Sequence, residues 1–125
     1  MRKDEAKHWF DKAKHDLAAG NFLLKDDGFT DTICFFAHQV VEKALKGTLT
    51  LHDIKPDRTH NLITLADEAE KYLPEINEHQ NEIESLNDYY IPSRYPVDPP
   101  VDYSKEDAES ALQNARKILK LLSDF

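Results

Sequence analysis

The sequence predicts an all-α protein, folded as an antiparallel up-and-down helical bundle of four long helices plus one short helix. Apolar residues recur at helical spacing along most of the chain, and no segment shows the alternation typical of a half-buried strand. Only three glycines are present, and four of the six prolines fall between Pro92 and Pro100. Few breaks therefore interrupt the pattern, and we expect one domain over residues 1–125 with short connections between helices.

The first helix is expected from about Asp4 to Lys25. Its apolar stripe follows helical spacing and consists of Ala6, Trp9, Phe10, Ala13, Leu17, Gly20 and Leu24. Gly20 weakens the helix by about 1 kcal/mol relative to alanine. Its place within the stripe therefore predicts close packing against a neighbouring helix, and Gly28 is suited to end the helix.

The second helix is expected from Asp31 to Leu51 and should be the central element. Its apolar residues cover nearly half of the circumference and are Ile33, Phe36, Ala37, Val40, Val41, Ala44, Leu45 and Thr48. A stripe this wide requires contact with at least two other helices.

The third helix is short, from about Asn61 to Tyr72, and Asn61 is suited to cap its start. Pro74 ends that helix, and the fourth should run from about Glu75 to Tyr90. Three polar residues fall on or beside the inner face of the fourth helix: His79, Gln80 and Asn87. Such a face is either lightly packed or lines a site.

The proline-rich segment IPSRYPVDPPVDY should be extended, because proline removes a backbone donor and restricts the residue before it. The last helix is expected to begin at Ser104, with Asp107 three residues later as in a capping box. Its inward stripe consists of Ala108, Ala111, Leu112, Ala115, Ile118, Leu119 and Leu122. The three alanines in this stripe permit close helix packing.

Composition narrows the possible functions. The chain has 16 Lys and Arg against 24 Asp and Glu, a net charge of −8, which disfavours non-specific binding of nucleic acid. Its single cysteine, Cys34, cannot form an internal disulfide. No pair of histidines has the spacing of a metal motif, and we expect neither a metal nor a cofactor. With no apolar run of about 20 residues and no signal peptide, we expect a cytoplasmic protein without membrane contact.

The second helix carries a polar face with two interpretations. Glu42, Lys43 and Lys46 could form a solvated face with a Glu–Lys pair one turn apart, or the lysines could bind phosphate or an acidic partner. Phe35 and Leu49 are expected on the same outward face, together with Gln39 and Glu42. A large aromatic ring on a polar face favours an interface, so we predict a homodimer through Phe35, Gln39, Glu42 and Leu49.

Arg94, Tyr95 and His60 are further candidates for binding. Arg94 and Tyr95 could anchor the proline-rich loop, or they could grip a phosphate and stack on a base. His60 precedes a helix and could pack there or donate to a phosphate at that positive helix end. The candidate nucleotide or phosphate site is therefore Arg94, Tyr95, His60, Lys43 and Lys46.

Four segments together resemble the HEPN family (higher eukaryotes and prokaryotes nucleotide-binding). They are Trp9 with Ala13 and Asp16-Leu17, the run from Phe35 to Lys46 (FFAHQVVEKALK), Thr59-His60-Asn61-Leu62, and Arg94-Tyr95-Pro96. The resemblance spans nearly the whole chain, and the second segment is its most specific part. It implies a helical bundle, usually a homodimer, of prokaryotic origin and often encoded beside a minimal nucleotidyltransferase.

Some members of that family are metal-independent ribonucleases, with an Arg and a His four to six residues apart late in the bundle. Here no histidine follows Arg94. We therefore expect a non-catalytic module that binds a nucleotide and a partner, acting with a nucleotidyltransferase in a toxin–antitoxin-like pair. The alternatives are a ribonuclease toxin and a purely structural dimerising bundle.

Overall fold

A computed structural model describes residues 2–26, 29–90 and 102–123, and it is helical without strands over those residues. Three helices are long: α1 (Lys3–Leu24), α2 (Thr30–Leu51) and α5 (Lys105–Leu122). The shorter ones are α3 (Leu62–Glu70), the 3-10 helix η1 (Pro74–His79) and α4 (Gln80–Asn87). The predicted all-α bundle is confirmed. In the described part of the chain, no helix is long and apolar enough to cross a membrane.

The long helices begin and end within about a residue of their predicted bounds, but the fourth helix does not. A continuous helix from Glu75 to Tyr90 was expected, and this expectation is wrong. The segment is divided into η1 and the short α4, because the backbone of His79 (φ −111°, ψ 19°) leaves the α-helical region between them. The bundle therefore has three long helices rather than four.

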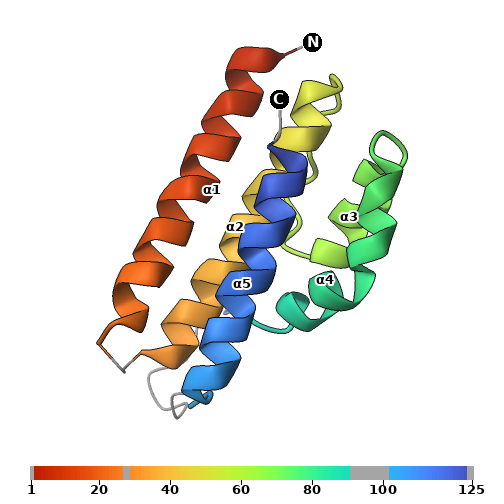
Figure 1. Ribbon diagram of the computed structural model, residues 1–125. Coiled ribbons are helices and arrows are strands. Elements are labelled where there is room, and N and C mark those ends of the chain that lie inside the picture. The colour runs from red at the N-terminus through yellow and green to blue at the C-terminus, as the bar shows by residue number, and fades with distance from the viewer. Residues whose placement is uncertain (1, 27–28, 91–101, 124–125) are drawn as a thin grey trace.

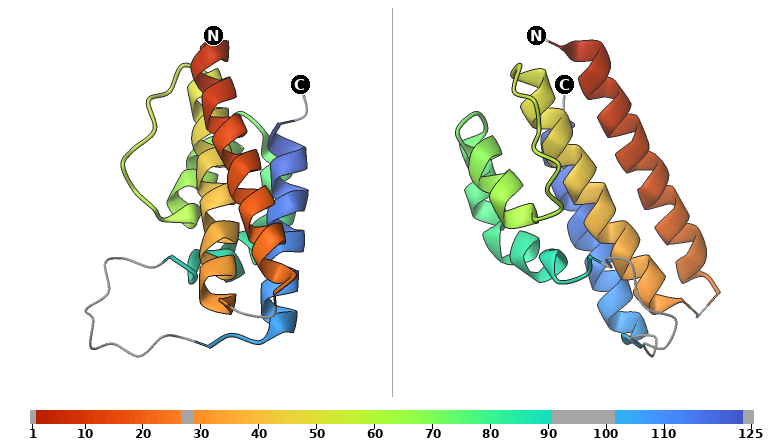
Figure 2. Two further views of the ribbon diagram at one scale, coloured as in Figure 1. Left: turned by 90° about the vertical axis from the view of Figure 1, so that its left-hand side faces the viewer. Right: turned by 180° about the vertical axis from the view of Figure 1, so that it is seen from behind.

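Figure 1 shows α1 and α2 running antiparallel, with α5 beside α2 and α3 and α4 on the side away from α1. The view from behind in Figure 2 gives the same order. Helix α2 contacts each of the other α-helices. It is the central element, as its wide apolar stripe predicted.

Two glycines permit the close approach of the long helices. A Cβ atom on Gly20 would lie 2.7 Å from Leu112 Cδ2, which confirms the predicted close packing. On α2, a Cβ atom on Gly47 would lie 3.0 Å from two atoms of the Phe10 ring and 3.1 Å from Trp9 Cβ. These short distances explain why both helices carry glycine despite its low helix propensity.

The end of α2 sets the course of the following loop. Asp53 has a left-handed backbone (φ 64°), and the Ile54 N–H donates to the Leu49 carbonyl at 2.9 Å. This is the pattern of a Schellman motif, which ends the helix and turns the chain back along it (Figure 2). The loop ends at Asn61, whose side chain accepts from the Ile63 and Thr64 amides and confirms the predicted cap of α3.

Ser104 and Asn87, two further residues that the sequence singled out, also have defined roles. Ser104 Oγ accepts from the Asp107 amide at 2.9 Å, so the last helix begins as the capping motif predicted. Asn87, expected near the inner face of the fourth helix, accepts from the Leu62 amide at 2.8 Å. This bond ties the end of α4 to the first turn of α3 and satisfies an amide that the helix itself leaves without a partner.

Candidate functional site

A row of polar side chains is buried along one side of α2. His38, Glu42 and Lys46 follow one another by one helical turn, and they are 0%, 4% and 6% exposed. Burying a charge costs several kcal/mol unless it is paired and its remaining hydrogen-bonding capacity is satisfied. This row is therefore the first place to look for a function, because perturbed and buried ionisable groups gather at functional sites.

Glu42 is the centre of the network. Its Oε2 accepts from Lys46 Nζ at 3.1 Å, which pairs the two buried charges. Its Oε1 accepts from His60 Nδ1 at 2.9 Å and from Gln39 Nε2 at 3.3 Å. Three donors from two segments thus converge on one carboxylate, and the buried anion is compensated.

His38 is the most buried residue of the row and is held by hydrogen bonds at both ring nitrogens. Its Nε2 donates to the His60 carbonyl at 2.9 Å, and a carbonyl can only accept, so this nitrogen carries the proton. Its Nδ1 then accepts from Gln39 Nε2 at 3.2 Å. Burial lowers the pKa of His38, which favours the neutral ring that this pattern requires.

His60 is the member of the network that is exposed at the surface. Its side chain is 48% exposed, and its ring stacks on Tyr90 with centroids 4.4 Å apart and planes 12° apart. Because Nδ1 donates to Glu42, the second ring nitrogen, Nε2, is the one available for other chemistry. A neutral ring presents a lone pair there, and a protonated ring presents a donor for an anion.

The structure brings together only part of the predicted phosphate site. His60 and Lys46 meet through Glu42, so the predicted Glu–Lys pair is present, but it is buried and not on a solvated face. Lys43 lies apart from them and pairs with Asp16 of α1. Arg94 and Tyr95 lie outside the described residues.

The predicted outward face of α2 is only partly correct. Phe35 and Gln39 are partly exposed, but Glu42 is 4% exposed and Leu49 is fully buried. The prediction that Leu49 faces outward is wrong, because its side chain belongs to the hydrophobic core. Of the four residues predicted for a dimer interface, Phe35 and Gln39 are therefore the two that are partly exposed.

Trp9 and His38 belong to the site although the sequence did not assign them to it. Tyr90, a candidate for an aromatic wall because of its place near Arg94 and Tyr95 in the sequence, stacks on His60. Lys46 Nζ lies 5.7 Å from the centroid of the Trp9 ring. The one-turn spacing of His38, Glu42 and Lys46 was a usable signal for a shared face. Among the described residues, no group of three or more His, Cys, Asp or Glu side chains could hold a metal ion.

Comparison with known proteins matches residues 6–125 to the HEPN domain. A relative from Methanocaldococcus jannaschii, provisionally named toxin MJ1304, is 30% identical over 133 residues, which cover 96% of this chain and 87% of the relative. The crystal structure of TT1696 from Thermus thermophilus matches with a TM-score of 0.79 and 29% identity, over 99% of this chain and 98% of that one. ST0689, described as an archaeal HEPN homologue, matches with a TM-score of 0.72 and 26% identity, over 95% of each chain.

Proposed function

The chain belongs to the HEPN domain family, and we propose that it is a non-catalytic member of that family that binds a nucleotide and a protein partner. The partner in this proposal is a minimal nucleotidyltransferase, in a toxin–antitoxin-like pair. One observation carries the nucleotide part: a half-exposed His60 whose ring is held on one side by the buried Glu42 carboxylate and stacked on Tyr90.

This arrangement suits a nucleotide for two reasons. Protonated His60 would offer Nε2–H to a phosphate oxygen, while Nδ1 stays bound to Glu42. The protein also has a net charge of −8, so its overall electrostatic field repels anions. Binding of a phosphate therefore requires a local hydrogen-bond donor such as His60. Arg94 and Tyr95 follow Tyr90 closely in the sequence and remain proposed as a phosphate fork and a base-stacking ring.

Calorimetry with ATP tests the nucleotide part. His60→Gln keeps an amide donor for Glu42 but removes the imidazole, and we expect it to weaken ATP binding severalfold with an unchanged helical circular dichroism signal. His8→Gln, an exposed histidine of α1, is the matched control and should bind as wild type does. Arg94→Lys should also weaken binding severalfold. Equal affinity for ATP in wild type and His60→Gln would reject this site.

The partner and the homodimer have separate tests. Co-expression with a minimal nucleotidyltransferase encoded beside this chain should yield a complex that survives gel filtration, and two separate peaks would reject that partner. For the homodimer, Phe35 remains the best-placed residue, partly exposed and 6.2 Å from the Tyr90 ring between centroids. Phe35→Glu should shift the mass in light scattering from dimer to monomer, and a monomeric wild type would reject the dimer.

A metal-independent ribonuclease toxin is the second candidate, and the Glu42–His60 pair favours it. A carboxylate at Nδ1 orients a histidine so that Nε2 can act as a general base, as in many hydrolytic sites. The relative from Methanocaldococcus jannaschii is provisionally named a toxin. RNA cleavage in the presence of EDTA that is lost in His60→Gln would establish this activity, whereas our first proposal predicts no cleavage by the isolated protein.

A further inference from the structure

A pocket of about 530 Å³ opens between the start of α1, the second half of α2 and the loop after α2. Four cationic side chains line it, namely Arg2, Lys46, Lys55 and Arg58. Two carboxylates, Glu5 and Asp57, also line it. The lining therefore carries more positive than negative groups, which favours anions locally in a protein with a net charge of −8.

Two of these cations are available for a ligand. Lys46 is paired with the buried Glu42, and Arg2 lies 3.8 Å from Glu5. Lys55 and Arg58 are exposed and form no ion pair with any residue in the described part of the chain. Both come from the loop that the Schellman turn directs back along α2, so the fold places two unpaired cations at the rim of one pocket.

Trp9 gives the pocket an aromatic wall. Its ring is partly exposed, and the first turns of α1 hold it against Lys46. Stacking of a base on an aromatic side chain is favourable and does not depend strongly on which base it is. An aromatic wall beside free cations is the combination that a nucleotide requires, because one part of the ligand is a flat ring and the other is an anion.

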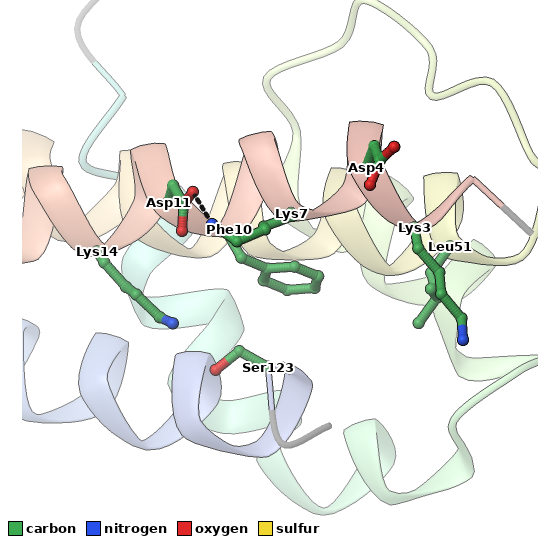
Figure 3. Close-up of a pocket in the computed structure, with 8 residues that line it drawn as sticks. All are labelled: Lys3, Asp4, Lys7, Phe10, Asp11, Lys14, Leu51 and Ser123. Carbon is green, nitrogen blue, oxygen red and sulfur yellow. Dashed lines mark hydrogen bonds and ion pairs between the residues drawn. The ribbon is translucent and has the colours of Figure 1, made fainter.

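A larger pocket lies elsewhere against α1 but lacks this combination. It measures about 620 Å³, and Figure 3 shows Lys3 and Lys14 near its opposite ends. Its central lysine, Lys7, is bound to Asp11 at 2.6 Å, and this contact lowers the pKa of the Asp11 carboxyl. Phe10 lines the pocket as well but is 2% exposed, with its ring in the core. The smaller pocket is therefore the better site for a nucleotide.

The smaller pocket is connected to the site proposed above through Lys46, which lines the pocket and is bound to Glu42. Arg58 precedes His60 by two residues, and two residues span at most about 7 Å. His60 does not line the pocket itself, but Glu42 links it through hydrogen bonds to Lys46 on the pocket wall. The volume is also within the range of about 300–1,000 Å³ found for small-molecule sites.

We propose that this pocket binds a nucleoside polyphosphate, with the base on Trp9 and the phosphates on Lys55 and Arg58, directed towards His60. The proposal rests on the nucleotide binding proposed above and assigns it to a location. Two features of the ligand are specified: a planar base and at least two phosphate groups, since two separate cations stand at the rim.

Trp9 is the single tryptophan of the chain, so its fluorescence reports on this pocket alone. Titration of the wild-type protein with ATP should change the emission of Trp9 and saturate. Adenosine and inorganic tripolyphosphate should each bind more weakly than ATP. The double variant Lys55→Ala/Arg58→Ala should weaken ATP binding at least about tenfold, since hydrogen bonds to charged groups contribute about 1.5–3 kcal/mol each.

The matched control is Lys7→Ala/Lys14→Ala, which removes two lysines from the larger pocket and should leave ATP binding unchanged. Calorimetry on the same variants separates the two proposals. ATP binding that is lost in His60→Gln but unchanged in Lys55→Ala/Arg58→Ala would overturn the pocket and leave the proposed function standing. Absence of ATP binding by the wild-type protein would overturn both, and tripolyphosphate binding as tight as ATP would overturn the role of Trp9.

Discussion

The side of α2 that packs on α1 and the side that meets the loop after α2 bury different kinds of groups. Towards α1, Gly47 lies against the ring of Phe10, and the contact is apolar and tight. Towards the loop, the buried groups are His38, Glu42 and Lys46, which are polar or charged and joined by hydrogen bonds. Both sides are closed to solvent, but only the first gains directly from the burial of apolar surface.

We infer that the apolar side of α2 stabilises the fold, whereas the polar side serves the candidate site. Replacing a buried ion pair by apolar groups of similar volume is often neutral or stabilising, whereas removing one partner alone is strongly destabilising. We infer that the Glu42–Lys46 pair is not needed for stability as such. Its position is explained by what it holds, because Glu42 also binds His60 at the surface.

The largest expected effect comes from breaking the polar side at its centre. Glu42→Leu leaves Lys46 buried without its partner and removes the acceptor for His60 and Gln39. We expect a loss of about 3–5 kcal/mol in the free energy of unfolding, as for other broken buried pairs. Urea denaturation measures it, and Glu109→Leu on the exposed side of α5 is the control. A loss under about 1 kcal/mol would mean that the pair is effectively solvated.

A smaller effect is expected from crowding the apolar side. A valine at position 47 would add two methyl groups where even a Cβ lies 3.0 Å from the Phe10 ring. Overpacking of this kind costs about 1–3 kcal/mol. The same urea measurement should show this loss for Gly47→Val, while Gln113→Val, on the exposed side of α5, reports the cost of a β-branched residue in a helix. Equal losses in the two variants would show that the contact between α1 and α2 can accommodate the added methyl groups.

The smallest effect concerns pH. Burial lowers the pKa of His38 in the folded protein below its ordinary value of 6.5. Above pH 6.5, His38 is neutral in both the folded and the unfolded protein. Below pH 6.5, His38 binds a proton in the unfolded protein before it does so in the folded protein. The free energy of unfolding therefore falls as the pH falls. As the pH falls from 6.5 towards the lowered pKa of His38, the His38→Gln variant should lose less stability than the wild-type protein. Thermal unfolding at a series of pH values measures this difference. Parallel pH profiles would show that His38 is not the group responsible.

The sequence predicted the elements whose signals are local. The apolar stripes of α1, α2 and α5, the caps at Asn61 and Ser104 and the packing role of Gly20 each depend on neighbours within a few turns or on one residue type. The division of the fourth helix at His79 could not be predicted, because Pro74 and the helical pattern that follows suit a continuous helix equally well.

The site was predicted in part, for a reason of geometry. The polar row on α2 is visible in the sequence, but whether it faces solvent depends on the loop after α2, whose residue His60 bonds to both His38 and Glu42. The contact of Tyr90 with His60 likewise joins residues 30 apart in the chain. Such long-range contacts have no local signal, and this explains why the stacking of Tyr90 on His60 and the place of Trp9 in the site were not predicted.

The central claim is that the polar side of α2 exists to position His60 and not to stabilise the fold. The double variant Glu42→Leu/Lys46→Met tests it most directly, by urea denaturation and ATP calorimetry on the same preparation. We expect the free energy of unfolding to return to within about 1 kcal/mol of wild type, because no charge is left buried without a partner. ATP affinity should nevertheless fall at least about tenfold, since His60 loses the acceptor that holds its ring in place. A double variant as unstable as Glu42→Leu alone, or one that binds ATP as wild type does, would contradict the claim.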